Sequence, residues 1–182
     1  MTAQQLVDAI LGLGVTIQPH PSNEQDCQYQ SPDDPGRQDR SSVTLQEGVL
    51  LSEWASGHRV MEIGTGLGVS TVALAHHADV VHTIDPSEWV RSALTMPQNV
   101  RQWASVEDVP GTFGRIFIDG LHDFASVCKD IESALLMLSP EGQVAFHDMC
   151  QSDVRAAVDS FDWKDRIEYP TVGLLTFCMV KA

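Results

Sequence analysis

The sequence predicts one doubly wound α/β domain with a mostly parallel, seven-stranded sheet, and three observations indicate that fold class. Short apolar runs alternate with helix-length segments from residue 60 onward. The first of these runs leads directly into a glycine-rich loop and the start of a helix. The chain has 182 residues, of which 43% are hydrophobic, which is enough for one well-buried core and too few for two substantial domains.

The region before residue 60 is predicted to contain two helices separated by an irregular segment. Apolar residues recur at helical spacing over residues 6–13, which indicates a short N-terminal helix. Residues 18–42 are rich in Pro, Asp, Gln and Ser, so we expect a linker or a substrate-side lid without regular structure. Thr44 and Glu47 have the spacing of a capping box, which predicts that a second helix follows them.

The strands of the sheet are expected at residues 60–63, 80–84, 100–103, 116–118 and 144–146. Apart from the weaker run 100–103, these runs carry apolar residues on both faces, as in parallel strands that helices cover on both sides. Helical periodicity over 124–138 and 154–161 predicts two of the covering helices. The tail, with segments 166–169 and 173–180, predicts an antiparallel hairpin at the edge of the sheet.

The most informative segment is the loop in VMEIGTGLGVST, residues 60–71. Its three glycines let backbone approach a ligand where the N–H groups of a new helix are free. A dinucleotide fingerprint spaces its glycines G-x-G-x-x-G, whereas this loop reads E-x-G-x-G-x-G, which argues against NAD. Asp85 ends the next strand, about where an acid that binds ribose hydroxyls is expected. The loop therefore predicts a cofactor site.

With EIGTGLG and TIDP, the chain resembles the class I S-adenosylmethionine-dependent methyltransferases from about residue 45 to the C-terminus. The resemblance implies a Rossmann-like methyltransferase fold with S-adenosylmethionine as the cofactor. It divides the chain into 1–43, an N-terminal helix and irregular linker or lid, and 44–182, an S-adenosylmethionine-binding methyltransferase domain. The cofactor-binding residues expected are Glu62, Gly64, Thr65, Gly66, Gly68, Ser70, Asp85, Ser105 and Asp119.

A narrower resemblance lies in IDGLHDFASVCKDIESALLMLSPEGQVAFHDM, residues 118–149. It is similar to the small metal-assisted O-methyltransferases that include macrocin and other sugar O-methyltransferases. Their pattern is D-G-x-H, a helix with an internal Asp, P-G-G, and then H-D or E-D. This chain has Asp130 as the internal acid, and Glu141 stands where the family usually has a glycine.

The expected chemistry follows from two strands that end in acids and imidazoles. Parallel neighbours ending at Asp119 and at His147-Asp148 would place their side chains at the carboxyl edge of the sheet, beside the glycine loop. We expect a hard cation such as Mg²⁺ there, held by Asp119, His147 and Asp148, which would acidify a substrate hydroxyl. The resemblance gives His122 the role of catalytic base. The alternative for both histidines is a hydrogen bond to a neighbouring loop.

The expected function is methyl transfer from S-adenosylmethionine to a hydroxyl oxygen of a small molecule, a sugar or a secondary metabolite. Metal assistance stays open. One alternative is a non-catalytic S-adenosylmethionine-binding domain. An NAD-dependent oxidoreductase is disfavoured by the glycine spacing and by the lack of a Tyr-x-x-x-Lys pair. A DNA or RNA base methyltransferase is disfavoured because IDGLH stands where an N-P-P-aromatic signature is expected.

Charge and composition restrict the partners. The chain has 25 acidic and 11 basic residues and a formal charge of −14, which repels phosphate backbones, so we expect no nucleic-acid partner. We find no basic N-terminal region and no apolar run that approaches membrane-spanning length, so a cytoplasmic protein without a membrane partner is expected. The four cysteines stand singly, as reduced thiols do. The acceptor, the role of residues 18–42 and a homodimer stay open.

Overall fold

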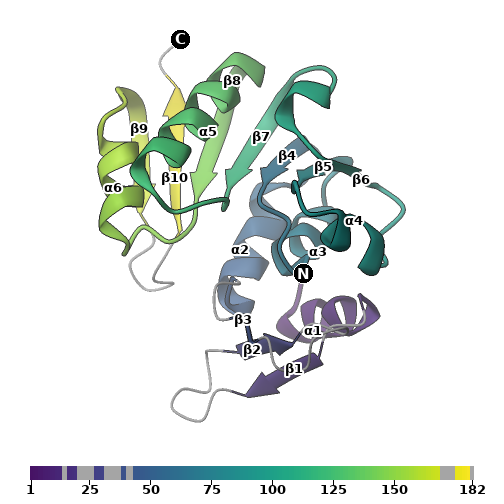
Figure 1. Cartoon of the computed structure of the whole chain (residues 1–182). Coiled ribbons are helices and arrows are strands. Elements are labelled where there is room, and N and C mark those ends of the chain that lie inside the picture. Colours follow the sequence, from purple (N-terminus) through teal and green to yellow (C-terminus); the bar gives the residue numbers. More distant parts are fainter. Residues whose placement is uncertain (14–15, 20–26, 31–37, 40–42, 169–174, 181–182) are drawn as a thin grey trace.

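A seven-stranded sheet with the order β6-β5-β4-β7-β8-β10-β9 forms the centre of the molecule (Figure 1). The structure is a computed structural model that describes residues 1–13, 16–19, 27–30, 38–39, 43–168 and 175–180. The strands are β4 Arg59–Ile63, β5 Val80–Ile84, β6 Val100–Trp103, β7 Phe113–Ile118, β8 Leu138–Phe146, β9 Trp163–Glu168 and β10 Thr176–Val180. The strands β4 to β8 pair in parallel, whereas β10 is antiparallel to both β8 and β9. The predicted fold class is confirmed.

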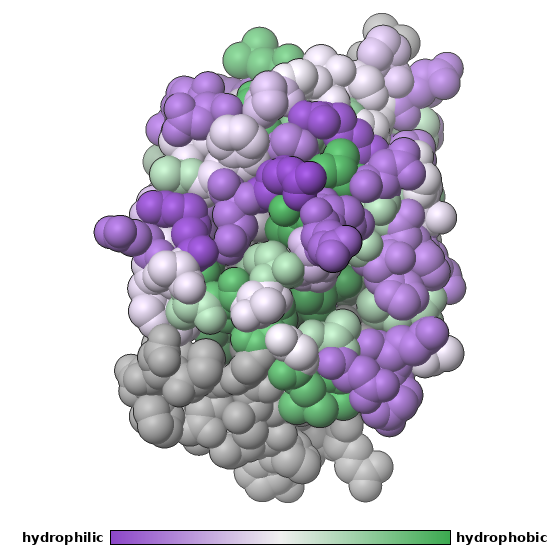
Figure 2. All heavy atoms as spheres, turned by 90° about the vertical axis from the view of Figure 1, so that its right-hand side faces the viewer, coloured by the Kyte–Doolittle hydropathy of each residue, from purple (hydrophilic) through white to green (hydrophobic). Residues whose placement is uncertain are grey.

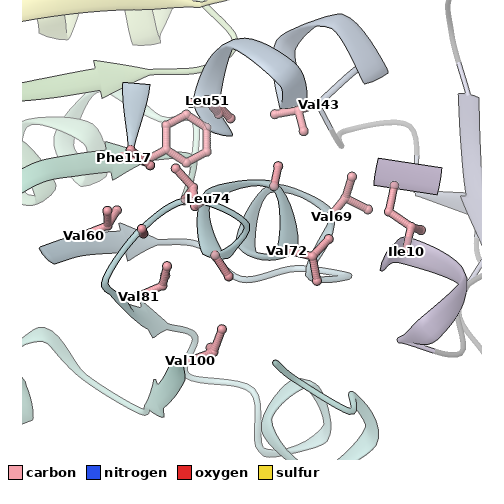
Figure 3. Close-up of a cluster of buried hydrophobic side chains, with 14 of the residues drawn as sticks. Ile10, Val43, Leu51, Val60, Val69, Val72, Leu74, Val81, Val100 and Phe117 are labelled. Carbon is pink, nitrogen blue, oxygen red and sulfur yellow. The ribbon is translucent and has the colours of Figure 1, made fainter. Parts of the chain in front are cut away.

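Helices cover both faces of this sheet because successive strand residues point to opposite sides. Val60 of β4 and Phe117 of β7 belong to one buried cluster with α1 Ala3–Gly12, α2 Leu45–Trp54 and α3 Val69–Ala75. Figure 3 shows this cluster, with the side chains of these two strands gathered below those of α2. The intervening residues Met61 and Ile116 join a second cluster with the helices α5 Phe124–Met137 and α6 Ser152–Asp159.

A side-chain cap begins α2 at the predicted position, and α4 and α5 also begin with side-chain caps. Thr44 and Glu47 form a complete capping box at the start of α2. The carboxylate of Asp123 accepts a hydrogen bond from the backbone N–H of Ser126 at the start of α5, at 3.0 Å. A further short helix, α4 Glu88–Ala93, begins at Ser87.

Strand β8 begins earlier than predicted. The segment Pro140-Glu141-Gly142 reads as a turn, but Leu138 already pairs with Phe113, and the register shifts before the regular pairing with β7 resumes. Glu141 has φ of 61°, a backbone conformation that glycine adopts most easily. The usual glycine of the related pattern therefore fits the backbone better than the glutamate found here.

The N-terminal region contains more regular structure than the sequence predicts. Helix α1 is confirmed, but β1 Thr16–Pro19 extends into the segment expected to be irregular, which also contains β2 Cys27–Gln30 and β3 Gln38–Asp39. The three strands form an antiparallel sheet in the order β1-β2-β3. The expectation of no regular structure is wrong for these residues. Pro19 is the last residue of the edge strand β1, and prolines within sheets occur mainly in edge strands. The rest of 18–42 lies outside the described residues, and the lid role stays a prediction.

The topology brings the residues that follow four strands to one edge of the sheet. The backbone N–H of Gly64 after β4 bonds to Ile84 at the end of β5, at 2.9 Å. The N–H of Asp119 after β7 bonds to Ile63 at the end of β4, at 2.8 Å. From β4 the chain continues to β5 on one side and later to β7 on the other, so ligands are expected at this edge.

Hydrophilic side chains dominate the face near β6 and α4, where Figure 2 shows them around a smaller strip of hydrophobic ones. The exposed large hydrophobic side chains include Leu11, Leu121, Phe124, Leu136 and Ile167, of which only Phe124 and Leu136 share a helix, α5. Among the described residues, no helix combines the length and the apolar character needed to cross a bilayer.

Candidate active site

The glycine loop, residues 64–68, joins β4 to α3 in a backbone conformation that requires glycine. Gly64, Gly66 and Gly68 all have positive φ, of 100°, 50° and 79°. A Cβ at Gly64 would lie 2.0 Å from the carbonyl oxygen of Asp119, so only glycine allows β4 and β7 to approach so closely. A Cβ at Gly66 would meet nothing within 4 Å, which leaves its backbone open to a ligand. Gly68 instead packs against side chains, the nearest being Met96.

Glu62 lies beneath the glycine loop. Its carboxylate, fully buried, accepts hydrogen bonds from the hydroxyls of Thr71 and Thr83, at 2.5 and 2.6 Å. Burial raises the pKa of Glu62 to about 7, although the hydroxyl hydrogen bonds oppose the shift. The sequence predicts Glu62 as a cofactor contact, but the structure directs it toward these threonines. It supports the loop from inside the protein.

Asp85 follows β5 and faces the same loop. Its Oδ2 accepts a hydrogen bond from the backbone N–H of Gly66 at 3.1 Å, and its Oδ1 accepts one from the N–H of Ser87 at 2.9 Å. Each carboxylate oxygen keeps a free lone pair, so Asp85 can still accept hydrogen bonds from two ligand hydroxyls. The sequence-based expectation for a ribose acceptor therefore has a suitable geometry.

A cavity of about 730 Å³ opens above the loop, within the size range of small-molecule sites. Seven of the nine predicted cofactor residues line it, whereas Glu62 and Gly68 do not. The seven are Gly64, Thr65, Gly66, Ser70, Asp85, Ser105 and Asp119. His122 lines the same cavity, so the predicted base shares one space with the predicted cofactor residues. The hydroxyl of Ser105 is already bonded to Glu107 in the same wall.

Two histidines and two aspartates converge beside this cavity; we call Asp119, His122, His147 and Asp148 the acidic cluster. Nε2 of His122 lies 3.1 Å from Oδ2 of Asp148 and 3.5 Å from Oδ1 of Asp119. Nδ1 of His147 lies 3.3 Å from Oδ1 of Asp119 and 3.4 Å from Oδ2 of Asp148. Asp148 has φ of 55°, so the turn after β8 directs its carboxylate back toward Asp119 through a strained backbone.

The acidic cluster has donor atoms suited to a divalent cation. Nε2 of His122, Nδ1 of His147 and Oδ2 of Asp148 are buried and have no aligned hydrogen-bond partner within the described part of the chain. One ligand atom each from Asp119, His122 and Asp148 lies within 4.8 Å of the others. Two carboxylates and an imidazole fit a small hard cation that keeps water or substrate oxygens. His147, predicted as a ligand, lies behind this group of three.

The charges of the cluster stabilise one another. Burial alone would raise the pKa of Asp119, but contacts with His122 and His147 hold it below its usual value. Contact with Asp119 raises the pKa of His122 against the opposing effect of burial. Burial would lower the pKa of His147, but contacts with Asp119, Asp148 and Glu47 raise it to about 12. Without a bound cation, the imidazoles supply the positive charge that the carboxylates need.

Two contacts of the cluster were not anticipated from the sequence. Nδ1 of His122 lies 3.1 Å from Nε2 of the Gln151 side chain. Nε2 of His147 lies 3.3 Å from Oε2 of Glu47 in α2. The capping-box spacing identified Glu47 only as part of a helix start, and no local signal marks Gln151.

Comparisons of sequence identify a domain and a relative. Residues 61–149 match a family described as a methyltransferase domain. The cypemycin N-terminal methyltransferase of a Streptomyces species is 33% identical over 98 residues, which are 50% of this chain and 39% of that protein. The matched region thus spans well under half the length of this relative.

Solved structures of methyltransferases share the fold. The O-methyltransferase from Bacillus cereus in complex with SAH has a TM-score of 0.62 and 19% identity, over 78% of this chain and 83% of that one. The O-methyltransferase TomG from Streptomyces achromogenes, in complex with SAM, has a TM-score of 0.60 and 19% identity, over 79% and 83%. N-methyltransferases and a tRNA methyltransferase match as well, so the fold leaves the acceptor open. Residues 61–149 thus match the methyltransferase domain family, and the chain has the Rossmann-like fold of these solved methyltransferases.

Proposed function

We propose that the chain transfers the methyl group of S-adenosylmethionine to a hydroxyl oxygen of a small molecule, a sugar or a secondary metabolite, with His122 as the base. One observation carries the proposal: the glycine loop and Asp85 line the same cavity as Asp119 and His122. A methyl donor and a proton acceptor must face a common space for a direct transfer.

The donor half of the cavity would hold the cofactor through backbone and carboxylate. The open backbone at Gly66 would allow close approach of the cofactor, and Asp85 would accept hydrogen bonds from the ribose hydroxyls. Methyl transfer is a displacement at a sulfonium, so the protein mainly orients the two reactants. The sulfonium leaves as a neutral thioether, and the positive charge passes to the acceptor oxygen.

The part of the cavity next to His122 would remove the proton from the acceptor hydroxyl. As the methyl–oxygen bond forms and the methyl–sulfur bond breaks, the hydroxyl proton passes to the imidazole of His122. Nε2 of His122 has no aligned hydrogen-bond partner among the described residues, and the ring lines the cavity. For Nε2 to take the proton, Nδ1 must carry the hydrogen of the neutral ring. The side-chain amide of Gln151, 3.1 Å from Nδ1, can accept that hydrogen through its carbonyl oxygen and so restrains the orientation of the ring.

A divalent cation fits the same place. Asp119 and Asp148 would hold it, and it would supply acidity to the acceptor hydroxyl. His122 cannot use Nε2 both as a ligand and as the base. A His122→Ala variant separates the two roles, because loss of a ligand weakens Mn²⁺ binding in the protein without substrate, whereas loss of a base affects turnover alone.

The proposal is tested by transfer of radiolabelled methyl from S-adenosylmethionine to a panel of sugars, catechols and hydroxylated metabolites. We expect transfer to at least one hydroxyl compound, and a loss of roughly 10²- to 10⁴-fold in His122→Ala with unchanged affinity for S-adenosylhomocysteine. The exposed His76 provides the control, since His76→Ala removes an imidazole far from the cavity lining. Wild-type turnover in His122→Ala would show that the imidazole is structural.

The acceptor class has a separate test. The charge of −14 supports a small molecule over tRNA or DNA, since too few cations are available to displace condensed counterions. Methyl incorporation into tRNA, with none into the small-molecule panel, would reverse this choice.

A further inference from the structure

Glu47 and His147 form a buried pair that joins helix α2 to the acidic cluster. Oε2 of Glu47 lies 3.3 Å from Nε2 of His147, and the exposed fractions of the two residues are 0% and 2%. A carboxylate oxygen accepts, so Nε2 of His147 carries the hydrogen. No ion pair between Glu47 and a lysine or arginine is present in the described part of the chain.

The opposite side of the same ring faces the aspartates. Nδ1 of His147 lies within 3.4 Å of a carboxylate oxygen of both Asp119 and Asp148. Glu47 therefore contacts one nitrogen of an imidazole whose other nitrogen contacts both carboxylates. A rotation of this ring would break the contacts on both sides.

Helix capping does not explain why Glu47 is buried. The capping box of α1, formed by Thr2 and Gln5, is exposed to solvent. In α2, Oε2 of Glu47 accepts the N–H of Thr44 at 2.8 Å, as a cap requires, but Oε1 is buried and has no hydrogen-bond partner among the residues that the structure describes. An unsatisfied buried oxygen is costly, and buried ion pairs are often no more stable than apolar replacements. Stability therefore gives little reason to retain this pair.

We propose that Glu47 is a positioning residue for the acidic cluster: through His147 it fixes the direction in which the carboxylates of Asp119 and Asp148 point. The inference rests on the proposed function, because it assigns these carboxylates to the acceptor side of the site. Two carboxylates that face one point repel each other when no cation lies between them. A ring held by Glu47 opposes their separation and keeps the cluster prepared for a cation or a substrate hydroxyl.

The loss of Mn²⁺ affinity expected for a Glu47 variant can be judged from similar substitutions at other metal sites. Groups that orient a metal ligand without touching the metal typically change metal affinity by roughly 10- to 100-fold when they are removed. We therefore expect Glu47→Ala to weaken Mn²⁺ binding by about that factor. The affinity for S-adenosylhomocysteine should stay within about twofold, because Glu47 does not line the cavity.

Two further variants separate positioning from helix capping. Glu47→Gln keeps an oxygen that accepts from both Thr44 and His147, so it should restore most of the Mn²⁺ affinity. Thr44→Ala removes the other half of the capping box, in which the Thr44 hydroxyl accepts the N–H of Glu47 at 3.2 Å, and leaves the contact with His147 intact. This control should have a lower melting temperature than the wild type but bind Mn²⁺ with the same affinity.

The experiment uses the full chain in two measurements. Long-range ¹H–¹⁵N spectra of the metal-free protein report the ring of His147, assigned by its loss in His147→Gln. We expect an exchange-protected Nε2–H in the wild type and in Glu47→Gln, and its loss in Glu47→Ala. Electron paramagnetic resonance then gives the Mn²⁺ affinity of each folded variant.

The outcomes separate this inference from the proposed function. An unchanged ring signal in Glu47→Ala, or an Mn²⁺ affinity within about twofold of the wild type, would overturn the positioning role. A Thr44→Ala protein that loses Mn²⁺ as strongly as Glu47→Ala would assign the effect to the helix cap and overturn it too. If the wild type binds no Mn²⁺, the metal part of the proposed function fails, and the ring spectrum alone decides the role of Glu47.

Discussion

The glycine loop and the acidic cluster lie side by side at one edge of the sheet, but residues at different distances along the chain support them. Glu62 beneath the loop bonds to Thr71 and Thr83, which are 9 and 21 positions away. His147 in the cluster contacts Glu47, 100 positions away. The loop is thus complete within two strands and one helix, whereas the cluster also needs α2 and β8. A change in either region should leave the other intact, unless it alters the place where they touch.

That place is Gly64, and its substitution should have the largest effect. A Cβ there would lie 2.0 Å from the carbonyl oxygen of Asp119, at a backbone φ of 100°. Gly64→Ala should lower the free energy of unfolding by roughly 2–5 kcal/mol, from strain and overpacking together. It should also weaken both S-adenosylhomocysteine and Mn²⁺ binding. Denaturant unfolding and calorimetry measure these effects.

Gly12→Ala is the control for Gly64→Ala. A Cβ at Gly12 meets nothing within 4 Å, and its φ is not positive. Its free energy of unfolding should stay within about 1 kcal/mol of the wild type or rise. If Gly64→Ala proves as stable as this control, the two regions are not in tight contact.

Gly66→Val should disturb the loop without the cluster. Its side chain would enter the open space of the cavity, so S-adenosylhomocysteine affinity should fall by about tenfold or more, equivalent to 1.4 kcal/mol. Mn²⁺ affinity should not change. Gly57→Val is the matched control, because Gly57 also has positive φ and open space around it but does not line the cavity. Equal losses of affinity in both variants would point to general strain.

Glu62 should make the stability of the glycine-loop region depend on pH. Its pKa is about 7 in the folded protein against 4.5 normally, because the buried site disfavours the carboxylate and Asp119 adds negative charge. The folded state therefore binds the extra proton, and this contribution to stability is complete below about pH 4.5 and is lost as the pH rises through about 7. At about 1.4 kcal/mol per unit, the loss is on the order of 3 kcal/mol.

The variant Glu62→Gln should remove that part of the pH dependence. The difference in unfolding free energy between wild type and variant, measured without cofactor from pH 4 to pH 8, should change in favour of Glu62→Gln as the pH rises. A constant difference across that range would mean that Glu62 titrates normally, and that the threonine hydroxyls satisfy its charge.

The loop depends on residues close together in the sequence and the acidic cluster on distant ones, and this difference explains which parts of the site could be predicted. The motif EIGTGLG and the position of Asp85 are local signals, and the structure places both at one cavity. The strand ends at Asp119 and at His147-Asp148 were expected to meet, and they do. Glu47 carried a local signal for a helix cap, but nothing in the nearby sequence shows that its carboxylate turns toward a residue 100 positions away.

Two further differences between the sequence-based predictions and the structure have physical reasons. Glu62 and Gly68 belong to the loop motif but do not line the cavity. The carboxylate of Glu62 is occupied by buried hydroxyls, and a Cβ at Gly68 would lie 3.1 Å from the side chain of Met96. The strands β1 to β3 were not predicted, because proline-rich composition hides short edge pairing when a proline falls at a strand end.

The central claim is that the cavity between the glycine loop and the acidic cluster binds S-adenosylmethionine. A calorimetric titration of the wild-type chain with S-adenosylhomocysteine, and separately with NAD, tests it most directly. We predict one-to-one binding of S-adenosylhomocysteine, with a melting temperature that rises with its concentration by mass action, and no heat with NAD. Binding of NAD without binding of S-adenosylhomocysteine, or no binding of either, would contradict the account.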